Sequence, residues 1–141
     1  MAKRFGGEER VEYDFIVKRD FKVPPKQEDF TVKRTYKGYL VFFTFVADRP
    51  ELVLRMHLAL GTTVFEFERS LNDLYDERLL GYTDRLPWLS RYDTGANVFV
   101  VNFTPSEALP FQKCIVSLRN PSSTDITISK FEALLLKVRG G

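Results

Sequence analysis

The sequence offers few side chains for nucleophilic or metal-assisted catalysis. His57 is the only histidine and Cys114 the only cysteine among 141 residues. One histidine cannot build a metal site of several imidazoles, and one cysteine forms neither an intramolecular disulfide nor a thiolate cluster. His57 lies in a strand pattern rich in Leu and Met, where we expect a packed or surface residue. Cys114 alternates with apolar residues, and a thiol on an apolar face is inert.

Carboxylate pairs could carry out glycoside hydrolysis, which needs two acids at a set separation. Glu66 and Glu68 project from one face of a predicted strand and lie about 7 Å apart by strand geometry. No other sequence feature points to catalysis by these two glutamates, and the alternation of the segment favours an outward polar face. The acids at 73, 76 and 77 are typical of the solvated face of a helix. We therefore expect the protein not to be an enzyme.

The remaining charged residues do not form a recognisable cofactor or nucleic-acid motif. Asp84 and Asp93 lack the spacing of a calcium loop, and no glycine pattern of a nucleotide site is present. We expect no metal and no cofactor. Basic pairs at 18–19 and 33–34 are interleaved with aromatics, as in single-strand binders. However, 21 basic residues stand against 19 acidic ones, and that balance argues against nucleic acid as a partner.

Aromatic residues between 82 and 92 form the most suggestive candidate site. Tyr82, Trp88 and Tyr92 fall in a segment, 82–95, that the pattern indicates to be an irregular loop. Loop aromatics either plug the end of a sandwich or form a contact patch for a protein or a sugar ring. Phe5 is a second contact candidate, because it is the only large apolar residue of a charged, glycine-containing N-terminal segment.

The elements that position these residues are short segments of alternating polarity. Val11, Tyr13, Phe15 and Val17 alternate with charged residues apart from Ile16, which predicts a half-buried strand. Further strands are expected at 30–36, 39–46, 52–60, 64–69, 98–103, 113–118 and 126–138. The segments 11–17 and 30–36 indicate edge or outer strands, whereas 39–46 is apolar on both faces and indicates a central one. Phe43, Phe45, Leu54 and Val116 are predicted core residues.

One segment carries a helical signal. Ser70 can cap a helix with Asp73 three positions on, and Gly81 stands where a left-handed C-cap is wanted. With eight or nine strands at a spacing near ten residues, the sequence predicts an all-β, antiparallel β-sandwich of jelly-roll type, with one short helix near residues 71–80. We expect a flexible N-terminal arm at 1–10 and a single domain at 11–139. No signal peptide or spanning helix is evident, so we expect no membrane partner.

A series of features between residues 38 and 138 points to a known class of proteins. An Asp-Arg-Pro break at 48–50 precedes a Leu-rich strand, and Arg91-Tyr92-Asp93 leads into a strand. Thr104-Pro105 and Pro110-Phe111 precede the segment 114–121. In these features the chain resembles small β-sandwich virion proteins that decorate heads or build tails and fibres of viruses and tailed phages. The resemblance implies an assembly role and repeated copies, and it assigns no site residue.

Two functions therefore follow as expectations. The first is a non-enzymatic structural protein, a virion or appendage component that forms homo-oligomers or binds other structural proteins, with Phe5 as an anchor. It would reside in the virion if the protein is viral and in the cytoplasm otherwise. The alternative is a carbohydrate- or receptor-binding module that uses Tyr82, Trp88 and Tyr92.

Overall fold

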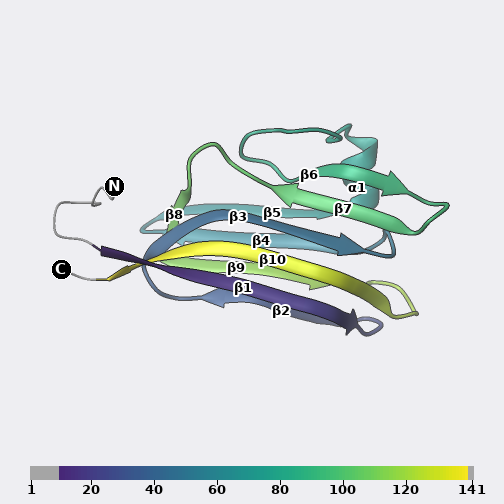
Figure 1. Cartoon of the computed structure of the whole chain (residues 1–141), viewed down its shortest axis with the longest axis horizontal. Helices are drawn as coiled ribbons and strands as arrows, with labels where there is room; N and C mark the ends of the chain where they lie inside the picture. Colours follow the sequence, from purple (N-terminus) through teal and green to yellow (C-terminus); the bar gives the residue numbers. More distant parts are fainter. Residues whose placement is uncertain (1–9, 140–141) are drawn as a thin grey trace.

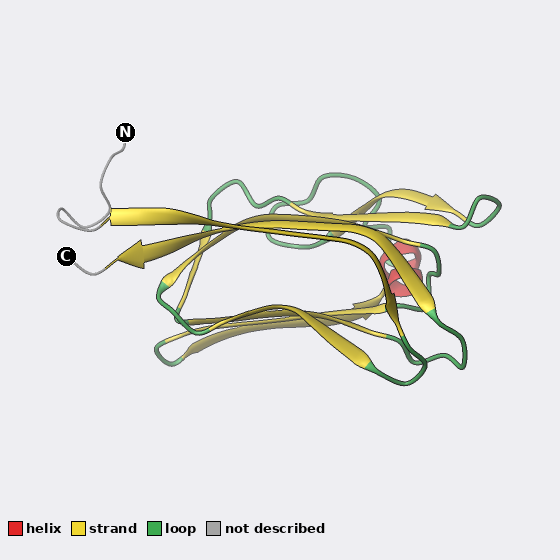
Figure 2. Cartoon of the chain, turned by 60° about the horizontal axis from the view of Figure 1, so that its bottom comes forward, coloured by secondary structure: helices red, strands yellow, loops and turns green. Residues whose placement is uncertain are grey.

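The structure is a computed structural model that describes residues 10–139. Two antiparallel sheets lie face to face (Figures 1 and 2). The first has the order β1-β10-β3-β7-β6, with β8 paired to β3, and the second has the order β2-β9-β4-β5. The strands of the first sheet are β1 (Arg10–Val23), β3 (Gly38–Ala47), β6 (Trp88–Asp93), β7 (Val98–Phe103), β8 (Leu109–Phe111) and β10 (Ile126–Arg139). Those of the second are β2 (Glu28–Arg34), β4 (Val53–Leu60), β5 (Thr63–Ser70) and β9 (Lys113–Arg119).

The predicted all-β sandwich is confirmed, and its strand order is that of a jelly roll. When β6 and β8 are set aside, the pairs are nested: β1 with β10, β2 with β9, β3 with β7, and β4 with β5. Contacts of β10 with β3 and of β9 with β4 join these pairs into the two sheets. This is the doubled-over arrangement that defines a jelly roll. The expected edge positions of the first two strands and the central position of β3 are also confirmed.

The part of the chain that the structure describes has ten strands rather than the eight or nine predicted. The additional strands are β6, inside the segment expected to be an irregular loop, and β8, inside the expected 104–110 connection. A register shift between Leu89 and Arg91 breaks the alternation of β6, which hides it from a period-two search. β8 is only three residues long and contains Pro110.

The predicted helix is present but shorter than expected. α1 (Leu71–Asp76) begins at Ser70, whose side chain and that of Asp73 form the predicted capping box. The helix ends near residue 77 because Arg78, with φ of 64°, takes the left-handed position that was expected of Gly81. The N–H of Leu79 donates to the carbonyl of Leu74 at 2.9 Å, the closing bond of a Schellman motif. No helix within residues 10–139 is long and apolar enough to cross a membrane.

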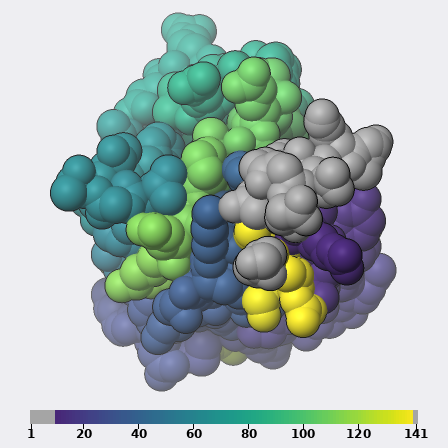
Figure 3. Space-filling model, turned by 90° about the vertical axis from the view of Figure 1, so that its left-hand side faces the viewer, coloured from purple at the N-terminus to yellow at the C-terminus, as the bar shows by residue number. Residues whose placement is uncertain are grey.

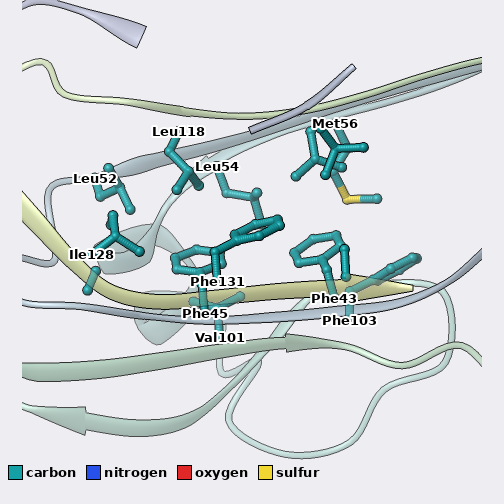
Figure 4. Close-up of a cluster of buried hydrophobic side chains, with 14 of the residues drawn as sticks. Phe43, Phe45, Leu52, Leu54, Met56, Val101, Phe103, Leu118, Ile128 and Phe131 are labelled. Carbon is teal, nitrogen blue, oxygen red and sulfur yellow. The ribbon is translucent and has the colours of Figure 1, made fainter. Parts of the chain in front are cut away.

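The core lies between the sheets and is rich in phenylalanine (Figure 4). The four predicted core residues, Phe43, Phe45, Leu54 and Val116, are all buried. Side chains of Leu54 and Met56 from the second sheet meet the ring of Phe43 and its neighbours from the first. The inward-facing sides of the two sheets therefore pack against each other. Any surface left for a partner must lie on the outer faces, edges or ends of the sandwich.

Side chains close the side of the sandwich where β1 and β2 are the edge strands. Arg34 of β2 donates from Nε to Asp14 Oδ2 of β1 at 2.7 Å, and the hydroxyl of Tyr36 donates to the same carboxylate. The guanidinium of Arg34 holds the pKa of Asp14 below its usual value despite partial burial. Lys18 of β1 forms a second bridge to Asp29 of β2 at 2.7 Å. Asp14 therefore faces the other sheet, which fixes the side to which its neighbours in β1 point.

Candidate functional site

Two of the predicted contact aromatics lie together. The rings of Tyr82 and Trp88 meet edge to face, with centroids 6.2 Å apart and planes at 77°. Tyr82 is 58% exposed. The indole Nε1 of Trp88 donates to Thr104 Oγ1 at 3.3 Å, which orients the ring. The pair offers one exposed phenol beside a half-buried indole rather than two coplanar rings.

Tyr92 lies elsewhere. In the β6–β7 register Trp88 is opposite Asn102 and Tyr92 is opposite Phe99. Residues 99 and 102 are an odd number of positions apart, so they point to opposite faces of the sheet, and their partners do the same. Tyr92 stacks on Tyr75 of α1 at 4.1 Å between centroids, and burial raises the pKa of its phenol. The structure thus brings Tyr82 and Trp88 together without Tyr92. Phe5 lies outside the described residues.

The residues considered for catalysis are distributed as surface or core groups. His57 Nδ1 lies 2.9 Å from Glu66 Oε2, and both side chains are on the outer face of the second sheet. Glu68 is held by Arg55 at 3.4 Å and by Arg119 at 3.1 Å. Cys114 is buried, and burial raises its pKa to about 12. Within residues 10–139, no three His, Cys, Asp or Glu side chains group as metal ligands would.

An apolar pocket of about 260 Å³ opens at the end of the sandwich that Figure 3 shows. Its walls come from the β4–β5 hairpin and β8, with Arg85 of the 82–87 segment at the rim. It is somewhat smaller than the 300–1,000 Å³ usual for drug-sized ligands. Apart from Arg85 and Thr63 the lining residues of the pocket are apolar, so the pocket offers few polar groups to orient a ligand. Its lining residues are Leu58, Leu60, Thr63, Phe65, Arg85, Leu109 and Pro110.

The outer face of the first sheet carries an apolar patch that sequence reasoning did not assign. Tyr13, Phe15 and Val17 of β1 are 78%, 60% and 45% exposed. They point away from the core because Asp14 and Ile16, between them, point toward it. The predicted strand at 11–17 is therefore present, but its apolar side faces outward rather than toward the core. Its one irregularity, Ile16, was the available signal.

The patch continues from β1 onto its neighbours. Phe15 is opposite Leu134 of β10, which is opposite Phe42 of β3, and Tyr13 is opposite Leu136 of β10. Leu134 and Leu136 alternate with the buried Ala133 and Leu135, so they share the outer face. We call this surface, made of Tyr13, Phe15, Val17, Phe42, Leu134 and Leu136, the outer apolar patch.

The patch is most exposed at β1 because β1 is an edge strand. Among the described residues, β1 pairs only with β10 and has no ladder partner on its other side. Side chains of β10 have neighbours on both flanks and are half-buried, whereas those of β1 have a neighbour on one flank only. The missing flank is where a further strand would lie.

The outer face of the second sheet is different in character. Arg55 lies between Glu28, at 2.9 Å, and Glu68, at 3.4 Å. Together with the His57–Glu66 contact, these ion pairs make this face rich in charge contacts within the chain. The two outer faces of the same sandwich therefore differ, one apolar and one ion-paired. A comparison with known protein families and with curated proteins finds no match for the chain.

Proposed function

We propose that this protein is a structural protein that assembles with further copies of itself, as a component of a larger particle such as a virion or an appendage. The observation that carries the proposal is the outer apolar patch, whose most exposed members lie along β1.

An apolar patch of this kind favours coverage by a partner. Monomeric proteins rarely expose contiguous apolar surface without a use for it, and burial contributes about 25 cal/mol per Å². Three neighbouring strands contribute to the patch, and the aromatics Tyr13 and Phe15 lie at its outer edge. Aromatic side chains are enriched where protein partners meet. Coverage of this face would remove the largest of these side chains from water.

Two further features support copies of the same chain as the partner. The net charge is +2, so copies repel one another only weakly. The fold adds a weaker support by analogy, because jelly-roll sandwiches are common among capsid proteins, although lectins and cupins also have them.

The proposal is tested by sedimentation velocity over a wide range of protein concentration. We expect the sedimentation coefficient of the unmodified protein to rise with concentration. Phe15→Ser should weaken this association while leaving the thermal midpoint nearly unchanged, because the ring is largely exposed. Phe30→Ser is the matched control, since Phe30 is 53% exposed but lies on β2 of the other sheet. A protein that stays monomeric at all concentrations would overturn the proposal.

The exposed Tyr82 beside Trp88 favours a second candidate, a carbohydrate-binding module. A sugar ring would stack on Tyr82 and contact the edge of the indole, which Thr104 holds in place. This alternative uses a different surface from the outer apolar patch, so variants of one leave the other intact.

A further inference from the structure

We propose that β1 pairs antiparallel with β1 of a second copy, across a two-fold axis at Phe15, so that the two first sheets become one continuous sheet. This inference rests on the proposed self-assembly and adds which strand mediates it and in which register.

The free edge of β1 is suited to pairing. β1 has fourteen residues, contains no proline and keeps an unshifted register with β10 along its length. Of the other edge strands, β2 and β6 both have register shifts, and β5 keeps its register but is only eight residues long. Natural edge strands usually prevent pairing by bulges, proline or charge. β1 has one backbone irregularity, Asp20 with φ of 50°, toward its C-terminal end. Over the rest of the strand only charge opposes pairing, so the arrangement of the charges decides whether pairing is prevented or directed.

Only a few registers are open to two identical antiparallel strands. In an antiparallel pair, two opposed residues either both direct their N–H and C=O groups toward each other or both direct them away. These directions alternate along a strand, so the sequence numbers of two opposed residues must be both odd or both even. The two-fold axis therefore passes through a residue that opposes its own copy. Each candidate register can be named by that residue.

An axis at Phe15 makes the edge complementary to itself. Glu12 then opposes the partner's Lys18, and Lys18 opposes the partner's Glu12. Tyr13 opposes the partner's Val17, and Phe15 opposes the partner's Phe15. No like charges face each other along the strand, and cross-strand pairs of these types are favourable.

Neighbouring registers all place like charges opposite each other. An axis at residue 14 sets Asp14 against itself, and an axis at 13 sets Glu12 against Asp14. An axis at 16 sets Glu12 against Asp20, and an axis at 17 sets Asp14 against Asp20. Like charges directly opposite destabilise a strand pair. The charges of β1 therefore select the register centred on Phe15.

The same pairing places a strand along the side of β1 that has no neighbouring strand among the described residues. Tyr13, Phe15 and Val17 are the most exposed residues of the outer apolar patch, and within residues 10–139 their cross-strand neighbours come only from β10. In the proposed register each gains an apolar neighbour from the partner. The exposure of these side chains and the charge pattern of the strand thus have one common explanation.

Disulfide trapping tests the register directly. Cys114 is buried, so a variant with one cysteine added on β1 has a single accessible thiol. F15C should cross-link on mild oxidation, because directly opposed residues have Cβ atoms about 5 Å apart. Y13C alone and V17C alone should not, since each thiol is displaced by about 13 Å from its copy. A mixture of Y13C and V17C should cross-link, and F30C is the control for a thiol at a similarly exposed phenylalanine.

Charge reversal supplies an independent test. E12K or K18E alone should weaken self-association roughly tenfold, because two symmetry-related pairs change from attraction to repulsion. The double variant E12K/K18E should associate like the unmodified protein. Within the chain Glu12 contacts Arg139 and Lys18 contacts Asp29, and neither contact is restored by the double variant. Recovery of self-association in the double variant must therefore come from contact between residues 12 and 18 of different copies. K113E, on an exposed residue of β9, is the control for net charge.

The outcomes separate this inference from the proposed function. If the protein associates but F15C does not cross-link, or if Y13C cross-links in the absence of V17C, the register is overturned and self-assembly stays in place. Failure of the double variant to recover overturns the register as well. A strictly monomeric protein overturns both.

Discussion

Replacing Phe43 with alanine tests the core on which every outer surface depends. Phe43 is fully buried in β3, at the middle of the first sheet. Its ring lies 6.4 Å from that of Phe45, 5.4 Å from that of Phe103 and 6.0 Å from that of Phe131, centroid to centroid. The substitution removes one ring from the centre of this aromatic cluster.

The expected cost follows from three contributions. Burying a phenylalanine side chain contributes about 1.5–3 kcal/mol, and each well-oriented aromatic pair adds about 0.5–1.5 kcal/mol. The cavity left behind adds a further cost, because a sheet pinned on both sides by ladder bonds cannot collapse into it. Measured losses for buried Phe→Ala changes are about 3–5 kcal/mol. We expect a loss near 4 kcal/mol for Phe43→Ala.

Urea titration followed by circular dichroism measures this loss. With a slope of about 2 kcal/mol per M, the midpoint should fall by about 2 M. Phe30→Ala is the matched control, and its loss should stay below about 1 kcal/mol because Phe30 is exposed on β2. Both variants should be measured at the same low protein concentration, since self-association adds to apparent stability. A loss below about 1 kcal/mol for Phe43→Ala would refute the packing described for β3.

Three further predictions concern single positions. Asp14→Asn should lower the free energy of unfolding near neutral pH by about 1 kcal/mol. Because Arg34 lowers the pKa of Asp14 in the folded state, this difference should be fully present above about pH 4 and should vanish as pH falls through the folded-state pKa. Urea titrations at several pH values measure it. Gly38→Ala should cost about 1–3 kcal/mol by thermal melting, because a methyl group there would overlap the carbonyl oxygen of Leu136. If the indole and its neighbouring phenol bind a sugar, Trp88→Ala should abolish retention on insoluble polysaccharides; retention that is absent in the unmodified protein, or unchanged in the variant, would contradict this.

The fold class was readable from the sequence because strand spacing and alternation depend on local residues. Phe43 and Phe45 alternate within a run that is apolar on both faces, and that run became the central strand. The helix start was readable for the same reason, since Ser70 and Asp73 satisfy each other locally. The helix end was not. The left-handed position fell on Arg78, a residue type that carries no signal for it.

The candidate site was less predictable, because it depends on which side of a strand meets the core. Alternation in β1 identifies two faces but not their orientation, and the inward face turned out to carry Asp14 and Ile16. Asp14 can face inward because two side chains some twenty residues later reach it, Arg34 at the end of β2 and Tyr36 in the connection to β3. Likewise, the separation of Tyr92 from Trp88 follows from a bulge that local sequence does not reveal.

The pairing of the first and last described strands has a mechanical consequence. Arg10 pairs with Arg139, so both ends of the described chain leave the sandwich at the same corner (Figure 3). A pull that separates these ends acts along the ladder bonds, which run perpendicular to the strands, and it loads them one pair at a time. The molecule should therefore open like a zipper at low force, from Arg10 toward Val23. A pull applied between Arg10 and Ile126, at opposite ends of the same ladder, would shear all its bonds together and meet much greater resistance.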